Sequence, residues 1–199
     1  LVEKDDRLVL SLKMVLERFV GFHSVVDIDS EIVKLADNQT KQEDLRVIEP
    51  GKSLLLLEVN GRDTGRGKDE FAMQCEKWVR RAKSRESRDD IRGVVILNHQ
   101  RNLLPIKRNE NPFSRDQIED AINLDMTLFT TWDLFILVRE MHRHKWPQNA
   151  VKSLFFKAGR HDTVPNNYRM LGTVTNVWRQ QEAFACSIGI DLKASDVIA

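Results

Sequence analysis

Leu54-Leu55-Leu56-Leu57-Glu58-Val59-Asn60-Gly61 is the most informative stretch of the chain, because an apolar run ends there in polar residues. The four leucines predict a strand that is buried on both faces of a sheet. Residues i and i+2 of a strand point to the same face, so Glu58 and Asn60 are expected side by side. Burying an unpaired carboxylate is costly, and we therefore expect a cation, a metal ion or water beside Glu58.

A β-hairpin is predicted around this strand, because residues 44–48 and 53–59 flank Glu49-Pro50-Gly51-Lys52. A Pro-Gly pair is typical of a tight turn. A three-residue loop would put Asp44 opposite Glu58, with Cβ atoms about 5 Å apart. A two-residue loop would turn the two side chains to opposite faces, and the sequence leaves both registers open. If the carboxylates meet, they repel by roughly 3 kcal/mol at an effective dielectric constant of about 20, and a divalent cation relieves that repulsion.

The rest of the chain alternates between helical and strand patterns, which predicts an α/β fold with a central sheet. Ser114 and Gln117 have the spacing of a capping box at the start of one helix. The expected helices are 7–20, 68–83, 115–124, 132–142 and 148–158, and the expected strands are 22–28, 44–48, 53–59, 93–97 and 127–130.

The pattern changes twice towards the C-terminus, and this divides the chain into three predicted parts. Residues 1–145 form the α/β domain, and residues 146–169, which begin near a Trp-Pro break, form a helical linker. Residues 170–199 are rich in β-formers without a helical pattern and predict a small all-β appendage.

Composition limits the class of protein. The 31 Lys and Arg residues nearly balance the 30 Asp and Glu residues, so no overall basic field marks a nucleic-acid binder. The basic run 77–88 has the bland interpretation of a solvated helix face. Two distant cysteines form neither a disulfide framework nor a metal knuckle. No segment approaches the roughly 20 apolar residues of a membrane span, and no secretory signal is visible, which predicts a cytoplasmic protein. Because the chain begins at Leu1, we expect it to be part of a longer chain.

From about residue 7 to residue 138 the chain resembles the PD-(D/E)XK, or restriction-endonuclease-like, superfamily. Asp44 stands at the position of the first acid, Glu58 at the second, and Asn60 at the usual lysine. The helix with Gln74 and Trp78 resembles the Q-x-x-x-(Y/W) helix of some branches. The resemblance implies a restriction-endonuclease-like core with a mixed central sheet flanked by helices. The tail from residue 171 resembles, faintly, the opening strands of a translation-factor-type barrel.

The resemblance implies a nuclease with Asp44 and Glu58 as ligands of Mg²⁺ or Mn²⁺, Asn60 positioning water and Gln74 supporting the site. Asparagine brings no positive charge, and losing one well-placed donor costs on the order of 10²–10³ in rate. A lysine from elsewhere could replace that charge, and the candidates are Lys52, Lys68 and Lys77. The alternative function is a catalytically degenerate fold that binds nucleic acid or assembles with other proteins.

The expected partner is nucleic acid, DNA rather than RNA, and the resemblance allows a homodimer. The residues expected to bind it are Arg62, Arg66, Lys68, Arg80 and Arg81. A third, purely structural hypothesis pairs Glu58 with Arg46, Arg62 or Arg66 and involves no nucleic acid. His99, at the end of an apolar strand, is interpreted as a structural hydrogen-bonding residue because no other metal-ligating residue has the right spacing.

Overall fold

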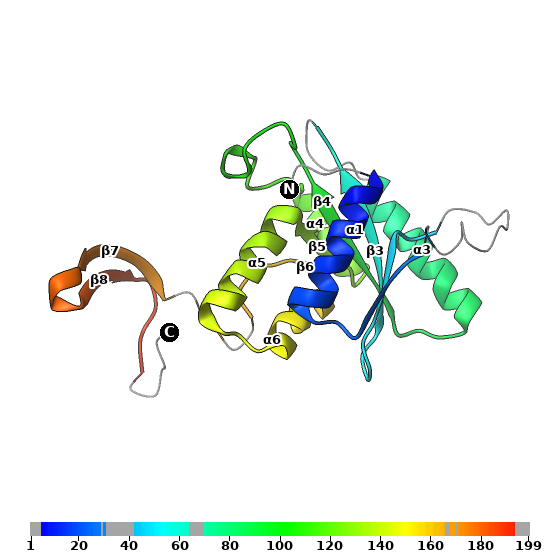
Figure 1. Cartoon of the computed structure of the whole chain (residues 1–199). Coiled ribbons are helices and arrows are strands. Elements are labelled where there is room, and N and C mark those ends of the chain that lie inside the picture. The colour runs from blue at the N-terminus through cyan, green and yellow to red at the C-terminus, as the bar shows by residue number, and fades with distance from the viewer. Residues whose placement is uncertain are drawn as a thin grey trace.

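A computed structural model describes residues 5–28, 30, 42–63, 70–165, 168–169 and 171–193, and of residues 5, 70 and 71 the backbone only. Its central element is a six-stranded mixed sheet in which the strands are ordered as in the chain. The first three strands are antiparallel neighbours, and the third to the sixth run parallel. The strands are β1 (Ser24–Asp27), β2 (Leu45–Ile48), β3 (Leu54–Gly61), β4 (Ile91–Asn98), β5 (Thr127–Thr130) and β6 (Gly159–Arg160). The predicted α/β class with a mixed central sheet is confirmed (Figure 1).

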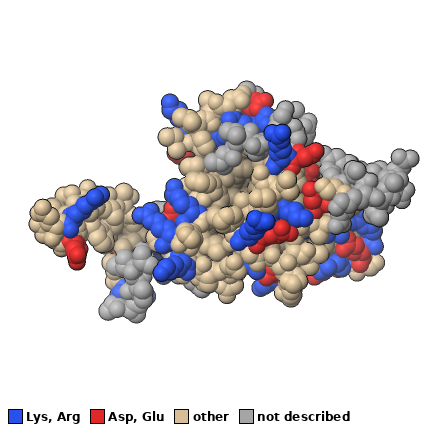
Figure 2. All heavy atoms as spheres, viewed as in Figure 1, with Lys and Arg blue, Asp and Glu red and all other residues tan. Residues whose placement is uncertain are grey.

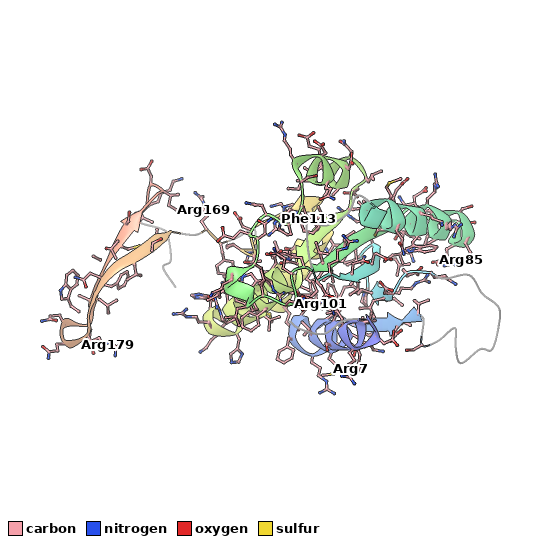
Figure 3. All side chains as sticks on the ribbon, turned by 90° about the horizontal axis from the view of Figure 1, so that it is seen from above. Arg7, Arg85, Arg101, Phe113, Arg169 and Arg179 are labelled. Atoms are coloured by element: carbon pink, nitrogen blue, oxygen red, sulfur yellow. The ribbon has the colours of Figure 1, made fainter. Side chains whose placement is uncertain are left out.

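Helices cover both faces of the sheet. One face packs against α1 (Asp5–Val15), which continues as the π-helical turn η1 (Leu16–Val20), and against α5 (Thr131–His144) and α6 (Gln148–Ser153). The other face packs against α3 (Glu70–Glu86) and α4 (Arg115–Asn123). Figure 3, seen from above, shows α1 with Arg7 on one side of the sheet and α3 with Arg85 on the other. The remaining short helical turns are η2 (Pro105–Lys107), η3 (Leu154–Phe156) and η4 (Arg179–Gln181).

The leucines of β3 divide between these two layers as a two-residue period requires. Leu55 and Leu57 belong to the core under α1 and α5. Leu54 and Leu56 pack with Trp78 of α3 in a second core. Glu58 follows the same parity as Leu54 and Leu56, so the strand delivers its carboxylate to the α3 layer.

The hairpin between β2 and β3 has the register expected for a three-residue loop. Val47 pairs with Leu55 and Leu45 with Leu57, which brings Asp44 opposite Glu58 one residue further along. Gly51 has a φ of 70°, a left-handed conformation that glycine adopts without strain, and the Lys52 N–H donates to the Glu49 carbonyl across the turn. The register of this hairpin therefore determines which acidic residues lie opposite each other.

Two local predictions have different outcomes. The capping box is confirmed, because Ser114 accepts from the Gln117 N–H and the Gln117 side chain accepts from the Ser114 N–H. The predicted helix 148–158 is too long, since α6 ends at Ser153 and a 3₁₀ turn follows. The tighter turn directs Phe155 into the core, where its ring lies 4.8 Å from that of Phe129.

Residues 146–169 do more than connect two parts of the chain. Trp146 and Phe155 lie in the principal core, and Gly159 begins β6. This segment thus completes the six-stranded sheet, where a linker was expected.

A separate antiparallel hairpin follows, made of β7 (Gly172–Trp178) and β8 (Ala183–Ile188). Every residue of β7 is exposed, and Figure 1 shows the pair standing apart from the six-stranded sheet. A bulge at Val174–Asn176 interrupts the ladder. In the described part of the chain, no helix has the length and apolar character needed to cross a membrane.

Candidate functional site

Asp44, which directly precedes β2, and Glu58 of β3 lie opposite each other and are here called the acid pair. The two residues are only 7% and 2% exposed. Asp44 Oδ2 accepts a hydrogen bond of 2.7 Å from the Val59 backbone N–H, so this carboxylate continues the ladder just beyond the end of β2. The bond fixes Asp44 against the segment that carries Glu58.

The Glu58 carboxylate is oriented by two side-chain donors. Trp78 Nε1 donates to Glu58 Oε2 at 3.1 Å, and Asn60 Nδ2 lies 3.4 Å from Glu58 Oε1. The parity of β3 places Glu58 under α3, and the helix supplies the indole that holds it. Glu58 and Asn60 are side by side, as the i, i+2 spacing predicts.

Two cationic side chains, Lys77 and Arg81, lie beside the Trp78 ring, whose indole N–H binds Glu58. Lys77 Nζ lies 5.2 Å, and the Arg81 guanidinium carbon 5.3 Å, from the centre of the Trp78 ring. Both distances are typical of cation–π contacts. Of the three lysines considered as replacements for the missing charge, Lys77 is therefore one helix residue away from the indole that binds Glu58.

The other two lysines have different outcomes. Lys52 lies in the turn at the opposite end of β3, and Glu58 is six residues further along the chain, about 20 Å away. The prediction of Lys52 as the substitute cation is therefore wrong. Lys68, and with it Arg66, lies outside the described residues.

Gln74 is half-buried on α3, one turn before Trp78. Its side-chain amide makes no hydrogen bond to another described residue. The contact from α3 to Glu58 is made by Trp78 instead. The supporting role of Gln74 stays a prediction. Its neighbour Cys75 is buried, and burial, followed by the charge of Glu58, raises the pKa of its thiol far above the usual range. Cys75 is thus a packing residue.

Of the residues predicted to bind nucleic acid, the three that the structure describes lie on two different segments. Arg62 follows β3, and its backbone N–H donates to the Asn98 carbonyl at 2.8 Å. Arg80 and Arg81 are exposed on α3. On the face drawn in Figure 2, Lys and Arg are interspersed with Asp and Glu.

Arg46, considered as a partner for Glu58, makes other contacts. Its guanidinium pairs with Glu43, and its Nη1 lies 3.0 Å from Glu86 Oε1. The predicted Arg46–Glu58 ion pair is therefore wrong. These contacts join the end of β2 to the end of α3 and leave Arg46 outside the acid pair.

The donor chemistry of the acid pair fits a hard divalent cation. Mg²⁺ prefers oxygen ligands and is commonly held by one or two carboxylates together with water and phosphate oxygens. An ionised carboxylate has about four lone-pair directions, so the observed hydrogen bonds are compatible with a bound cation. The described residues contain no group of three or more His, Cys, Asp or Glu side chains placed to hold a metal ion. Among the described residues, Asp44 and Glu58 are the two acids that would bind such a cation as a pair.

A cavity of about 390 Å³ lies at the carboxyl ends of β4, β5 and β6, and we call it the strand-end cavity. Sequence reasoning did not find it, because its wall comes from a loop without a regular pattern. The available signal was a side chain suited to binding at the end of each of three strands: His99 after β4, Trp132 after β5 and Arg160 at the end of β6. The lining residues are His99, Pro105, Ile106, Arg108, Asn109, Glu110, Thr130, Trp132, Asp133 and Arg160.

A buried polar network supports one wall of this cavity. Asn98 is fully buried, and its Oδ1 accepts from Arg108 Nη1 and from Thr131 Oγ1, both at 2.9 Å. Figure 3 labels Arg101 and Phe113, which lie at the two ends of the loop that contains Arg108. The two hydrogen bonds of Asn98 connect this loop to the end of β4 and to the start of α5.

Comparison with protein-family models, with curated proteins and with solved structures finds no match to this chain. Its function has to be argued from the geometry of its own residues.

Proposed function

We propose that the chain is a metal-dependent nuclease domain that hydrolyses phosphodiester bonds of nucleic acid, with Asp44 and Glu58 as the metal ligands. The observation that supports this most is the β2–β3 register, which places two buried acids opposite each other. A fold seldom buries two carboxylates together without a cation, because their repulsion adds to the cost of desolvation.

The residues around the acid pair have separable roles under this proposal. Val59 N–H fixes Asp44, and Trp78 Nε1 fixes Glu58, so both carboxylates are oriented before a cation binds. The Asn60 amide nitrogen is turned to Glu58, and its Oδ1 can accept a hydrogen bond from an attacking water. A bound Mg²⁺ would lower the pKa of water and neutralise charge on the phosphate.

Substrate phosphates would be held by cations on the rim of this site. Lys77 and Arg81, which flank Trp78, are exposed on α3 and can contact a nucleic-acid backbone. Arg62 follows the strand that carries Glu58. DNA is the proposed substrate class, in keeping with the resemblance to restriction-endonuclease-like proteins.

A second candidate function is a degenerate nuclease fold that binds nucleic acid or another protein without cleaving it. One observation favours it: the position usually taken by lysine holds Asn60, whose amide lies 3.4 Å from Glu58 and adds no charge. The two candidates share the acid pair and differ in whether it turns over substrate.

Cleavage assays separate these candidates. Labelled single- and double-stranded DNA and RNA are incubated with Mg²⁺ or Mn²⁺ and the wild-type chain, Glu58→Gln or Glu49→Gln. The proposal expects cleavage that falls at least about 100-fold in Glu58→Gln. Glu49→Gln is the matched control, since Glu49 lies at the far end of the same hairpin and pairs with Lys152.

A folded chain that binds DNA but cleaves nothing with either metal would contradict the nuclease proposal and support the second candidate. The Asn60→Lys variant sharpens that outcome. A gain of cleavage would show that the missing charge is what limits the site.

A further inference from the structure

The strand-end cavity lies where ligands of open α/β sheets usually bind, beyond the carboxyl ends of parallel strands. Its volume of about 390 Å³ falls within the range of roughly 300–1,000 Å³ that is common for small-molecule sites. It is lined by His99 directly after β4, by the loop 105–110 and by residues of β5, β6 and α5, and not by the acid pair. An inference about it stands independently of the proposed nuclease activity.

His99 brings an unpaired hydrogen-bond acceptor to this cavity. The residue is only 3% exposed, and its Nε2 lies 2.8 Å from the Asn109 carbonyl oxygen. A carbonyl only accepts, so Nε2 carries the hydrogen and Nδ1 is a bare acceptor. Nδ1 is buried and has no partner. Burial, together with Arg108 and Arg160, lowers the pKa of His99, which keeps the ring neutral.

Arg160 brings an unpaired donor to the same cavity. Its Nη2 donates to the Glu110 carbonyl at 3.1 Å and to Asp133 Oδ1 at 3.3 Å, whereas its Nη1 is buried without a partner. The guanidinium carbon also lies 5.4 Å from the centre of the Phe113 ring, so one face of the guanidinium group packs against this ring. Buried donors and acceptors are rarely left unpaired, and a pair of them lining one cavity suggests a ligand.

Four charged side chains line the cavity: the guanidinium groups of Arg108 and Arg160 and the carboxylates of Asp133 and Glu110. Asp133 already occupies the first turn of α5, where it accepts from the Thr130 N–H at 2.7 Å, so it offsets the positive end of the helix. Among the described residues, Arg160 Nη1 is the charged donor in the lining that stays unpaired. The ligand must therefore offer an anionic oxygen to Arg160 and a hydrogen to His99.

Phosphate monoesters meet both requirements. Their second pKa is about 6, so near neutral pH the group carries anionic oxygens together with a fraction of P–OH. Carboxylates and sulfate are fully ionised there and offer no hydrogen to His99. We propose that the strand-end cavity binds a phosphate monoester group, with Arg160 donating to an anionic oxygen and His99 Nδ1 accepting the hydrogen of a second oxygen.

The decisive measurement is calorimetric titration of the whole chain with inorganic phosphate and with sulfate at about pH 6. We expect saturable phosphate binding that is at least about tenfold tighter than sulfate binding, because the two anions share a shape and differ in the hydrogen. Equal affinity for both anions, or no saturable phosphate binding by the folded chain, would overturn the proposal.

Two arginine variants test the assigned donor. Arg160→Gln should weaken phosphate binding about tenfold. Arg92→Gln is the matched control, because Arg92 also has a buried unpaired Nε and an acidic partner, Asp125, but does not line the cavity. Equal affinities of the two variants would refute the role of Arg160. If Arg160→Gln fails to fold, NMR of the native chain replaces it, and an imidazole resonance of His99 that does not shift with phosphate overturns the proposal.

Phosphate binding should also weaken as the pH rises from about 6 to 8, because the ligand then loses the P–OH hydrogen that His99 Nδ1 accepts. The other charged groups that line the cavity are Arg108, Arg160, Asp133 and Glu110. Affinity that increases over this interval would contradict the shared hydrogen.

The source of the phosphate group is found with two further probes. Ribose 5-phosphate represents a small ester, and an oligonucleotide with or without a 5′-phosphate represents the end of a nucleic-acid strand. Preference for the phosphorylated end assigns the site to nucleic acid, and binding of the sugar phosphate alone assigns it to a small ester. Failure of both probes, with the native chain folded, would refute a monoester site.

Discussion

Strands β3 and β7 are of similar length, eight and seven residues, yet they have opposite surroundings. The first five residues of β3 are buried, whereas every residue of β7 is exposed. Strand β3 is paired with β4 along its whole length, and β7 is paired with β8 at every residue except Thr175. The difference shows that pairing alone does not bury a strand, and that a second layer is needed to hold polar strand ends in fixed positions. A two-stranded hairpin is at best marginally stable in water.

The largest effect that tests this comparison is expected for Leu56→Ala. Leu56 is fully buried between β3 and α3, and deleting such a side chain costs about 2–5 kcal/mol of unfolding free energy. Val177→Ala in β7 is the control and should cost under about 0.5 kcal/mol, because Val177 is 56% exposed. Urea denaturation measures both. Similar losses for the two variants would break the comparison.

Gly93→Ala is expected to have the next largest effect. A Cβ at Gly93 would lie 2.7 Å from Cys75 Sγ and 3.0 Å from Met126, so we expect a loss of about 1–3 kcal/mol. Gly189→Ala, just after β8, is the matched control, since its Cβ would meet nothing within 4 Å. Adding Cys75→Ala to Gly93→Ala should recover about 1 kcal/mol, and a strictly additive double variant would show that the crowding is elsewhere.

A smaller effect separates hydrogen bonding from charge at Asp44. Asp44→Asn keeps an oxygen for the Val59 N–H, whereas Asp44→Ala leaves that donor unpaired. We expect Asp44→Ala to be about 1–2 kcal/mol less stable than Asp44→Asn in thermal or urea unfolding. Equal stabilities would indicate that the bond to Val59 does not contribute.

The smallest effect depends on pH and concerns Glu49 at the end of β2. Burial tends to raise the pKa of this carboxyl, but bonds from Lys152 Nζ at 2.7 Å and the His23 N–H at 2.9 Å hold the pKa below its ordinary 4.5. A lowered pKa stabilises the fold above about pH 4.5, and this contribution is lost as the pH falls through the folded value. Glu49→Gln should cost about 1 kcal/mol at pH 7 and much less near pH 3. A cost of Glu49→Gln that is the same at about pH 3 and about pH 7 would contradict this contribution.

Much of the sheet could be predicted from the sequence, because the leucine run and the alternation of helical and strand patterns indicate which segments are buried. The hairpin register could not, since a loop of two or three residues fits Glu49-Pro50-Gly51-Lys52 equally well. Backbone pairing at Val47 and Leu55 decides it. The extent of α6 was also missed, because helical propensity alone does not show that Phe155 must turn towards Phe129.

The candidate site was partly predictable for the same reason. The i, i+2 spacing of Glu58 and Asn60 was sufficient to place them together. The bond from Trp78 to Glu58 depends on how α3 docks against β3, which no local pattern contains. His99 and Arg160 meet only because β4 and β6 end at the same edge of the sheet.

The bond between Trp78 and Glu58 gives the molecule a built-in optical reporter. Indole emission is sensitive to the charge beside its N–H, and Trp78 Nε1 lies 3.1 Å from the Glu58 carboxylate. A chain in which the other three tryptophans, Trp132, Trp146 and Trp178, are replaced by phenylalanine would emit from Trp78 alone. Its fluorescence would then register directly the arrival of any cation at the acid pair, whether or not the chain cleaves anything.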